Sequence, residues 1–410
     1  MDAPPVQPSA SARLLRQADS PRQLIVVTHY FSTHRGGVEL VAAELAQRLA
    51  SDHGWRVDWM ASDVDALPDH LTDAVVCHPA RAWNVLERRM GVPWPIWSPD
   101  ALFPLWRAVG RADAVHLHDA LYFGSAFAWL FARLRGVPVI VTQHVGTIPY
   151  RSWLLRFIHA LANRTLGRLL LSTAHQAVFI SPAVCEEFSR FCHYRSPPSY
   201  IPNGVDTAVF SPHGPVADDP EIVATRKSGR RVFLFVGRFV EKKGLRILHG
   251  LASMLPDDLW LLAGHGPIDP ALWKLPNVRV VRGQSGAGLA DYFRAADLLV
   301  LPSVGEGFPL VVQEAMACGT PVMVGTETAA GCPDARSLMI VEGIGPDDAS
   351  ATRWARRLAG LRADAEDLAG LRPAVARFAR ENWSWTRTSA RYAELLASLP
   401  VPSARKNRWP

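Results

Sequence analysis

Short apolar segments alternate with helical patterns along most of this chain, and this alternation constrains the fold more than any other feature. The first segment, QLIVVT at 23–28, is followed by the pair Gly36-Gly37 and by a helical pattern over 38–49. Further strands are predicted at 56–60, 114–118, 138–142 and 177–180. Continuous apolar runs of this length are typical of strands buried on both faces of a parallel sheet. The order strand–helix–strand therefore predicts an α/β domain with a doubly wound sheet.

The alternation stops in one stretch and then starts again. Residues 206–230 contain Pro, Gly, Asp and Ser without periodicity, and apolar strands are predicted again at 232–236, 259–263, 278–281, 298–301 and 321–324. A chain of 410 residues is also longer than one hydrophobic core usually supports. We therefore predict a disordered tail at 1–21, an N-terminal Rossmann-like domain at 22–205 and an interdomain connection at 206–230. A C-terminal Rossmann-like domain is predicted at 231–380, followed by a helix that packs back and a tail at 381–410. Open α/β sheets bind ligands at the carboxyl ends of their strands, so a cleft between the domains is the expected site.

Charge and cysteine content exclude several classes of protein. Lys and Arg number 44 against 38 Asp and Glu, so nucleic-acid binding is not expected, while anionic substrates and a membrane surface stay open. The five Cys are scattered without a C-x-x-C pair, which argues against disulfides or a zinc site. The N-terminal residues lack the apolar core of a secretory signal, and the longest apolar run, 121–132, is too short to span a bilayer. We expect a cytoplasmic protein, soluble or peripheral to the inner face of the cell membrane.

The most informative segment is 291–322, DYFRAADLLVLPSVGEGFPLVVQEAMACGTPV. Within it, Glu306-Gly307-Phe308 lies between a predicted buried strand and a predicted helix. The unpaired N–H groups at the start of a helix suit phosphate oxygens. Glu306 can accept hydrogen bonds from sugar hydroxyls, and Glu314, further along the helix, can reach a ribose diol. The alternative is a pair of solvated or capping glutamates.

This segment resembles the C-terminal domain of the retaining GT-B glycosyltransferases of family 4, the glycosyl transferases group 1. In that family a strand ends in Pro-Ser, a Glu-Gly-Phe turn follows, and a second Glu comes seven intervening residues later, the spacing of Glu306 and Glu314. The resemblance implies two Rossmann-like domains facing a central cleft, an N-terminal domain on the acceptor side and a C-terminal domain that binds the nucleotide-sugar. It covers most of 24–395 and weakens after Val324, so no role is assigned to 325–335.

A second motif, VGRFVEKKG at 236–244, resembles the loop that holds the donor pyrophosphate in this family. The family uses an Arg and a Lys five positions later, which are Arg238 and Lys243 here. Two fixed cations would stabilise the negative charge on a departing nucleoside diphosphate. The neighbouring Lys242 is predicted to be solvated.

Weaker motifs add further positions by the same resemblance. Gly36-Gly37 would lie against the donor phosphate, although a Gly pair before a helix is often only a tight turn. His144, in TQHVG at 142–146, would lie near the donor sugar, with a structural histidine as the alternative. His118 and Asp119 end a neighbouring strand and could contact the acceptor, although a structural role is equally open.

The resemblance implies transfer of a sugar, with retention, from a nucleotide-sugar donor to a saccharide or lipid-linked saccharide acceptor, in cell-surface polysaccharide or glycolipid synthesis. No cofactor and no metal are expected, and Asp63-Val64-Asp65 is interpreted as a chance match to a metal motif of another glycosyltransferase fold. The alternatives are a non-catalytic nucleotide-sugar-binding protein and another GT-B enzyme, such as a sugar-nucleotide epimerase. The predicted catalytic residues are Glu306, His144, Arg238 and Lys243, and the predicted donor-binding residues are Gly36, Gly37, Arg238, Lys243, Glu306, Gly307, Phe308 and Glu314.

The segment 150–171 predicts an amphipathic helix. Its apolar face holds Leu154, Leu155, Ile158, Leu161, Ala162 and Leu169, and the opposite face holds Arg156, Arg164 and Arg168 with Trp153 and Phe157. A stretch rich in Trp and Arg at 83–106 precedes it. Exposed basic and aromatic groups would suit a membrane surface that carries a lipid-linked acceptor. A core helix with one solvated face is the alternative.

Overall fold

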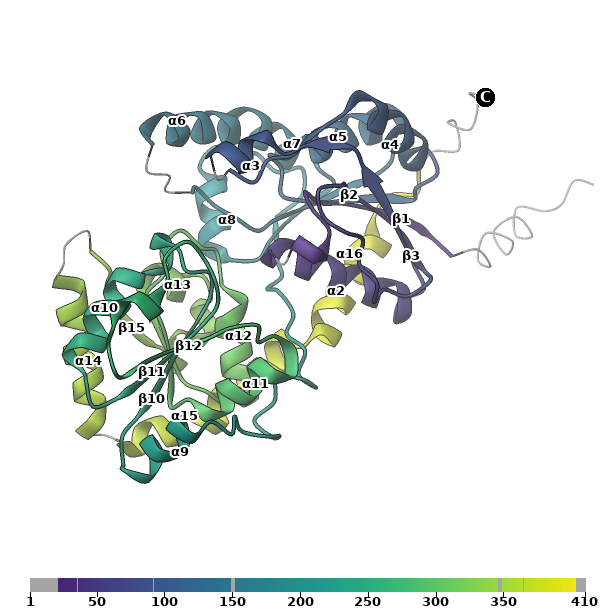
Figure 1. Ribbon diagram of the computed structural model, residues 1–410. Helices are drawn as coiled ribbons and strands as arrows, with labels where there is room; N and C mark the ends of the chain where they lie inside the picture. Colours follow the sequence, from purple (N-terminus) through teal and green to yellow (C-terminus); the bar gives the residue numbers. More distant parts are fainter. Residues whose placement is uncertain are drawn as a thin grey trace, which may run out of the picture. The chain divides into compact units, whose positions relative to one another are not determined.

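The computed structural model describes residues 21–34, 36–90, 92–148, 152–345, 349–363 and 365–402. The tail predicted at 1–21 lies outside these residues except for Pro21, as does the end of the chain from residue 403. The described strands form two large sheets flanked by helices (Figure 1). This arrangement confirms the predicted α/β fold with two Rossmann-like sheets. No helix in the described ranges is long and apolar enough to cross a membrane.

The first sheet has the strand order β3-β2-β1-β6-β7-β8-β9. Its strands are β1 (Gln23–Val27), β2 (Arg56–Ser62), β3 (Val75–Ala80), β6 (Ala114–His118), β7 (Val139–Gln143), β8 (Gln176–Phe179) and β9 (Ser199–Tyr200). Strand β1 pairs in parallel with both β2 and β6. Helix α2 (Gly37–Ser51) lies on one side of this sheet, and α4 (Leu102–Val109) and α5 (Phe123–Arg135) lie on the other (Figure 1). Val41, Leu45 and Leu49 of α2 recur every four residues and are buried, which explains why this segment is a helix packed on the sheet.

The second sheet has the order β12-β11-β10-β13-β14-β15, and each neighbouring pair is parallel. Its strands are β10 (Val232–Val236), β11 (Leu259–Ala263), β12 (Val278–Val281), β13 (Leu298–Leu301), β14 (Val322–Gly325) and β15 (Ile340–Glu342). Figure 1 shows α10 (Leu245–Met254) and α14 (Ala349–Ala363) on one face, and α11 (Gly286–Ala295), α12 (Leu310–Ala317) and α15 (Ala365–Trp383) on the other. All five residues of β10 are buried, as expected for a central strand covered on both faces. Leu234→Asp would put an unpaired charge into this core and should prevent folding.

The remaining elements are shorter or lie outside the two sheets. They are η1 (Ser32–His34), β4 (Ala82–Trp83), α3 (Val85–Met90), β5 (Ile96–Trp97), η2 (Pro99–Ala101), α6 (Trp153–Ala162), the π turn η3 (Asn163–Gly167), α7 (Arg168–Thr173), α8 (Pro182–Ser189), α9 (Pro220–Lys227), η4 (Glu241–Lys243), η5 (Pro270–Trp273), α13 (Thr326–Ala330), η6 (Pro333–Leu338) and α16 (Trp385–Ser398). Helix α9 lies inside the segment 206–230, which has no apolar periodicity. Asp219 caps it by accepting from the N–H of Glu221, and Pro220 occupies its first position, so capping rather than an apolar stripe defines this helix.

The chain divides into two compact units. The first comprises residues 1–141, 173–176 and 392–410, and the second comprises 142–172 and 177–391. The domain boundaries inferred from the sequence stay a prediction. In each sheet the strand order reverses direction once. The reversal lies between β1 and β6 in the first sheet and between β10 and β13 in the second. Ligands of open α/β sheets bind at the carboxyl ends of strands at such points.

Candidate active site

The carboxyl ends of β10 and β13 lie side by side in the second sheet, although β11 and β12 separate these strands in the sequence. The loop after β10 carries Arg238 and Lys243, and the loop after β13 carries Glu306. The strand order therefore brings together the two strongest sequence motifs. Neither motif predicts this proximity by itself, because it depends on which strands are neighbours.

Lys243 and Glu306 form an ion pair, with 2.5 Å between Nζ and Oε1. Their side chains are only 14% and 13% exposed. Partial removal from water strengthens the attraction between the two charges and makes either charge costly without the other. The pair therefore holds both side chains at the carboxyl edge of the sheet.

The backbone of the two loops is also joined. The N–H of Val304 donates to the carbonyl of Lys242 over 2.9 Å. Gly244 follows Lys243 with φ at +77°, and a Cβ there would collide with the carbonyl oxygen of Pro302. Glycine at 244 is required by both conditions, and it lets the lysine loop approach the glutamate loop closely.

Three cationic side chains lie in the segment that follows β10. Arg238 and Lys242 are exposed beside Lys243. Desolvation by the surrounding protein lowers the pKa of Lys242, while Glu306 acts to raise it and Lys243 and Arg238 act to lower it further. Cations grouped in one loop offer positive charge to an anion.

The turn Glu306-Gly307-Phe308 is packed tightly on both sides. Phe308 is buried and lies 5.4 Å from Trp383 between ring centroids. A Cβ at Gly307 would lie 2.8 Å from the carbonyl oxygen of His144, a distance that real Cβ atoms do not adopt. Glycine at 307 thus lets the segment after β7 reach the turn.

His144 is buried at the end of β7. Burial lowers its pKa to about 3, because a desolvated imidazole disfavours the charged form. The side chain is therefore neutral at pH 7 and can both donate and accept a hydrogen bond. Its role near a sugar stays a prediction.

Glu327 is a polar residue of this site that the sequence motifs missed. Its Oε1 accepts the N–H of Gly305 over 3.0 Å, so it holds the loop that carries Glu306. Glu327 lies in α13, within the segment 325–335 to which no role was assigned. The available signal was its position just after β14, since β14 is the neighbour of β13 and their carboxyl ends share one edge.

A pocket of about 460 Å³ lies beside this loop within the second unit. Glu306 is the predicted site residue in its lining. The sequence motifs missed Glu187, whose carboxylate accepts the N–H of Thr147 at 3.1 Å and also its hydroxyl. The lining residues are Gly146, Thr147, Ala160, Asn163, Arg164, Ala183, Val184, Glu187, Arg190, Phe191, Gly305, Glu306 and Glu327.

Glu314 lies on α12 and is half-buried. Burial raises its pKa to about 7, because the ionised carboxylate loses hydration there. The neighbouring Gln313 donates to the carbonyl of Asn203 over 2.7 Å and so fixes α12 against that segment. Glu314 is therefore held on a rigid helix in a partly protonated state at neutral pH.

Gly36 is the N-cap of α2 and Gly37 is the first residue of that helix, in the first unit. A Cβ at Gly36 would collide with the carboxylate of Glu39, whereas a Cβ at Gly37 would meet no atom within 4 Å in the described part of the chain. Packing therefore does not explain glycine at 37, where the exposed backbone leaves room for a ligand. Burial raises the pKa of Glu39 to about 7.

His118 and Asp119 lie at the end of β6 and are 1% and 3% exposed. Asp119 has φ at +63°, a strained value for a residue other than glycine. Its carboxylate accepts a hydrogen bond from the hydroxyl of Tyr122 over 3.1 Å. Backbone strain of this kind is common at functional sites. The acceptor role of His118 and Asp119 stays a prediction.

The Asp63-Val64-Asp65 triplet makes contacts within the protein. Asp63 accepts the N–H of Ala82 at 2.9 Å, and Asp65 pairs with Nδ1 of His34 at 2.9 Å. No group of three or more His, Cys, Asp and Glu side chains arranged to hold a metal occurs among the residues that the structure describes.

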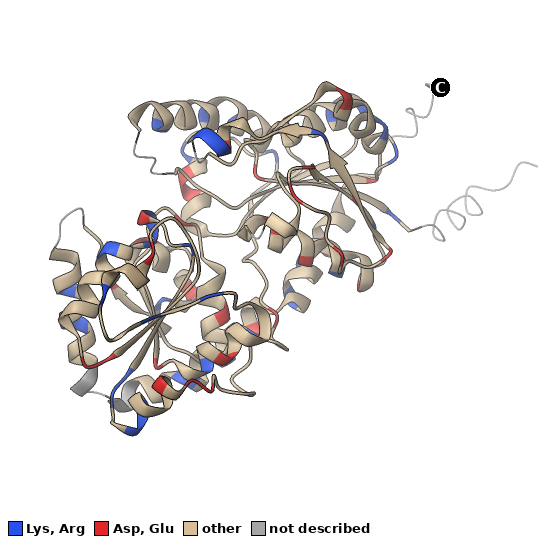
Figure 2. Cartoon of the chain, viewed as in Figure 1, with Lys and Arg blue, Asp and Glu red and all other residues tan. Residues whose placement is uncertain are grey.

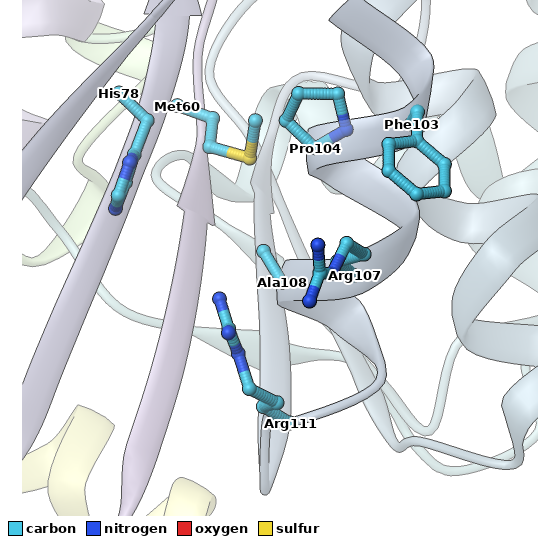
Figure 3. A pocket seen from close by; sticks show the side chains of 7 residues that line it. All are labelled: Met60, His78, Phe103, Pro104, Arg107, Ala108 and Arg111. Carbon is cyan, nitrogen blue, oxygen red and sulfur yellow. The ribbon is translucent and has the colours of Figure 1, made fainter. Parts of the chain in front are cut away.

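A second pocket, of about 340 Å³, lies in the first unit between α4 and the strands β2 and β3. Figure 3 shows Arg107 and Arg111 from the helical side and Met60 and His78 from the strands around this space. Asp58, next to His78 at 2.8 Å, has its pKa lowered overall: burial alone would raise it, but His78, Gln23 and Arg111 outweigh that effect. No sequence-predicted site residue lines this pocket.

Comparison with known proteins covers both halves of the chain. Residues 35–209 match the family model described as Glycosyltransferase Family 4, and residues 230–363 match the model described as Glycosyl transferases group 1. The D-inositol 3-phosphate glycosyltransferase of Thermobispora bispora is 31% identical over 320 residues, which cover 70% of each chain.

Two further matches extend over nearly the whole chain. The GDP-mannose-dependent alpha-(1-6)-phosphatidylinositol monomannoside mannosyltransferase of Mycolicibacterium smegmatis is 26% identical over 91% of this chain and 98% of its own. The crystal structure of Anabaena HepE in complex with UDP superposes with a TM-score of 0.68 at 16% identity, over 92% of this chain and 100% of that one. The structural match supports the GT-B fold.

Proposed function

The chain belongs to the family 4 and group 1 glycosyltransferases, and on that premise we propose that it transfers a sugar with retention and without a metal ion. The donor is a nucleotide-sugar, and the acceptor is a saccharide or a lipid-linked saccharide. The observation that carries the assignment of residues is the ion pair between Lys243 and Glu306 at the carboxyl ends of β10 and β13.

In this proposal Arg238 and Lys243 bind the donor pyrophosphate. Both follow β10, and their charges offset the charge that develops on the departing nucleoside diphosphate. Two fixed cations supply the neutralisation that a divalent metal would otherwise provide. Backbone N–H groups at Gly307 and Phe308, and the open backbone at Gly37, offer further donors to phosphate oxygens.

The two glutamates have separate roles. Glu306 accepts hydrogen bonds from hydroxyls of the sugar, and Glu314 accepts them from the ribose diol. When the pyrophosphate binds Lys243, Glu306 loses its partner and becomes available to the sugar. His144, neutral because of burial, hydrogen-bonds a sugar hydroxyl without adding charge.

The configuration at the anomeric carbon is retained because the acceptor oxygen attacks the same face from which the leaving group departs. The bond between the anomeric carbon and the phosphate oxygen breaks, and the acceptor oxygen bonds to the same carbon on the same face. The proton of the acceptor hydroxyl passes to the released phosphate. No carboxylate is assigned as a covalent nucleophile, because Glu306 is engaged by Lys243 and then by sugar hydroxyls.

The names of the relatives narrow the substrates. The mycobacterial relative uses GDP-mannose and acts on a phosphatidylinositol mannoside, and HepE binds UDP. We therefore propose a uridine or guanosine diphosphate sugar as the donor, and glycolipid or cell-surface polysaccharide synthesis as the setting. The two curated relatives named above are transferases. This favours neither a non-catalytic nucleotide-sugar-binding protein nor a sugar-nucleotide epimerase.

A thermal-shift screen against UDP-, GDP- and ADP-sugars tests this proposal. A ligand at 100 times its dissociation constant stabilises the folded state by ~2.7 kcal/mol, so one nucleotide class should raise the melting temperature clearly. The purified protein should then slowly hydrolyse that donor in the absence of an acceptor. If a nucleotide-sugar stabilises the protein but is neither hydrolysed nor transferred, the protein would instead be a non-catalytic nucleotide-sugar-binding protein.

A further inference from the structure

Helix α6 exposes its apolar side chains. No residue of α6 is buried, and Trp153, Phe157 and Leu161 are 70%, 58% and 51% exposed. Leu154 and Ile158, beside them, are 49% and 44% exposed. Residues spaced by four lie on one side of a helix, so these five side chains form a continuous apolar face. The prediction that Trp153 and Phe157 lie opposite the apolar face is therefore wrong. The alternative of a core helix is therefore wrong for α6, because Leu154, Ile158 and Leu161 would belong to its buried side.

The helical run that contains this apolar face carries positive charge only. Residues 152–174 include Arg156, Arg164 and Arg168 and no Asp or Glu. All three Arg are exposed, and Figure 2 shows α6 without acidic residues along it. Aromatic and aliphatic side chains next to Arg, without acids, match a surface that is apolar inside and anionic outside.

We infer that α6 binds the surface of an anionic lipid bilayer. The apolar face enters the boundary between headgroups and acyl chains, and the three Arg contact lipid phosphates. A protein partner for a face of this charge would have to supply acidic groups around its own apolar patch, whereas an anionic bilayer provides both layers at once.

The Trp-rich stretch at 83–106 exposes fewer of its tryptophans: Trp83 is 52% exposed, but Trp97 and Trp106 are covered. Trp97 is buried at 2% exposure. Trp106 packs against Phe131 at 5.2 Å between ring centroids, with the guanidinium of Arg135 over it at 3.9 Å. The membrane contact is therefore assigned to α6.

The same helical run connects the membrane face to the pocket beside Glu306. Beyond Ala162 it continues through the π turn at 163–167 into α7. Ala160, Asn163 and Arg164 line the pocket of about 460 Å³. A bilayer held by α6 would thus bring the headgroup of a lipid-linked acceptor to that pocket. Bilayer binding itself needs neither donor nor acceptor. It can therefore be tested separately from the proposed transfer reaction, and failure of one does not imply failure of the other.

Flotation with vesicles tests the inference directly. The full chain is mixed with vesicles of phosphatidylglycerol and phosphatidylcholine at low salt, and with vesicles of phosphatidylcholine alone. We expect flotation with the anionic vesicles, release at high salt because exposed charges are screened, and little flotation with phosphatidylcholine.

Two variants with matched controls assign the binding to α6. Arg156/Arg164/Arg168→Gln should lower the partition onto anionic vesicles about 100-fold, since each basic residue near such a surface contributes ~1 kcal/mol. Arg356/Arg357/Arg377→Gln removes the same charge from exposed positions on α14 and α15 and should bind normally. Trp153/Phe157/Leu161→Ser should also lose binding, whereas Phe103/Leu134/Leu272→Ser, at similarly exposed positions, should retain it. Thermal melting of each variant checks that it is folded.

Three results would overturn the inference. The wild-type chain stays in the soluble fraction with anionic vesicles, or the Arg variant and its control float equally. Alternatively, light scattering finds a dimer that Trp153/Phe157/Leu161→Ser converts to a monomer while vesicles are not bound. That last result would assign the apolar face to self-association.

Discussion

Nζ of Lys243 lies 2.5 Å from Oε1 of Glu306, and this ion pair links the loops that follow two neighbouring strands, β10 and β13. In the proposed reaction the two residues bind different parts of the donor. The pyrophosphate competes with Glu306 for Lys243, and its binding releases Glu306 to the sugar. The pair thus couples recognition of the diphosphate to recognition of the sugar.

Lys243→Ala and Arg238→Ala should each leave the protein folded and reduce turnover on the order of 10²-fold, because each removes a fixed charge from the leaving group. Lys227→Ala is the control, since Lys227 is an exposed lysine at the end of α9, outside the loop after β10. Steady-state kinetics with the donor identified by thermal shift gives the comparison. Turnover of Lys243→Ala within a factor of two of the wild type would contradict the assignment.

Glu306→Gln and Glu314→Gln should separate transfer from nucleotide binding. Glu314→Gln should weaken binding of the free nucleoside diphosphate, since a ribose contact is made equally in the ground and transition states. Glu306→Gln should not weaken that binding, because it frees Lys243 for the diphosphate, yet it should reduce transfer. Calorimetry with the nucleoside diphosphate measures the first effect. An equal loss of affinity in both variants is the result that this division of roles does not allow.

The raised pKa of Glu314, about 7, predicts a dependence of binding on pH. Only the ionised carboxylate offers both oxygens to the ribose diol, so affinity for the nucleoside diphosphate should rise between pH 6 and 8, by about tenfold at most. Glu314→Gln should lack this rise, and the comparison removes the titration of the phosphate itself. An identical pH profile in the two proteins counts against the ribose contact.

The carboxyl group of Glu314 should also make the stability of the protein depend on pH, but in the opposite direction to the nucleotide affinity. The folded protein keeps a proton on Glu314 that the unfolded chain loses above about pH 4.5, the ordinary value for Glu. The free energy of unfolding should therefore fall as pH rises from about 4.5 to 7. Denaturant unfolding should find a weaker decline in Glu314→Gln, and a decline of the same size in both proteins would contradict it.

The patterns in the sequence predicted most strands of the two sheets because these strands are short apolar runs. They did not predict the edge strands β3, β9 and β15, which are shorter or less apolar. The patterns also predicted that Arg238, Lys243 and Glu306 follow strands. They did not predict the ion pair, because contact between these loops depends on the order of strands in the sheet. Glu327 was missed since its contact with Gly305 is fixed by the path of α13. The sequence left the exposure of α6 open, because a helical wheel identifies an apolar face without identifying what covers it.

Gly307→Ala should reduce transfer strongly, because its Cβ would lie 2.8 Å from the carbonyl oxygen of His144 and would displace the Glu306 turn. Gly370→Ala is the matched control. Gly370 is exposed inside α15, and a Cβ there meets no atom of the described residues within 4 Å, so alanine should stabilise the fold by about 0.5–1 kcal/mol. Kinetics and denaturant unfolding of both variants test this. Normal turnover in Gly307→Ala would mean that the close approach is not needed.

The anomeric configuration of the first product tests the central claim most directly. Proton NMR can follow the reaction with the donor that stabilises the protein and a saccharide or lipid-linked acceptor. The account predicts a glycoside with the same anomeric configuration as the donor, formed without added metal and nearly absent with Lys243→Ala. An inverted glycoside, or transfer by Lys243→Ala at the wild-type rate, would contradict it.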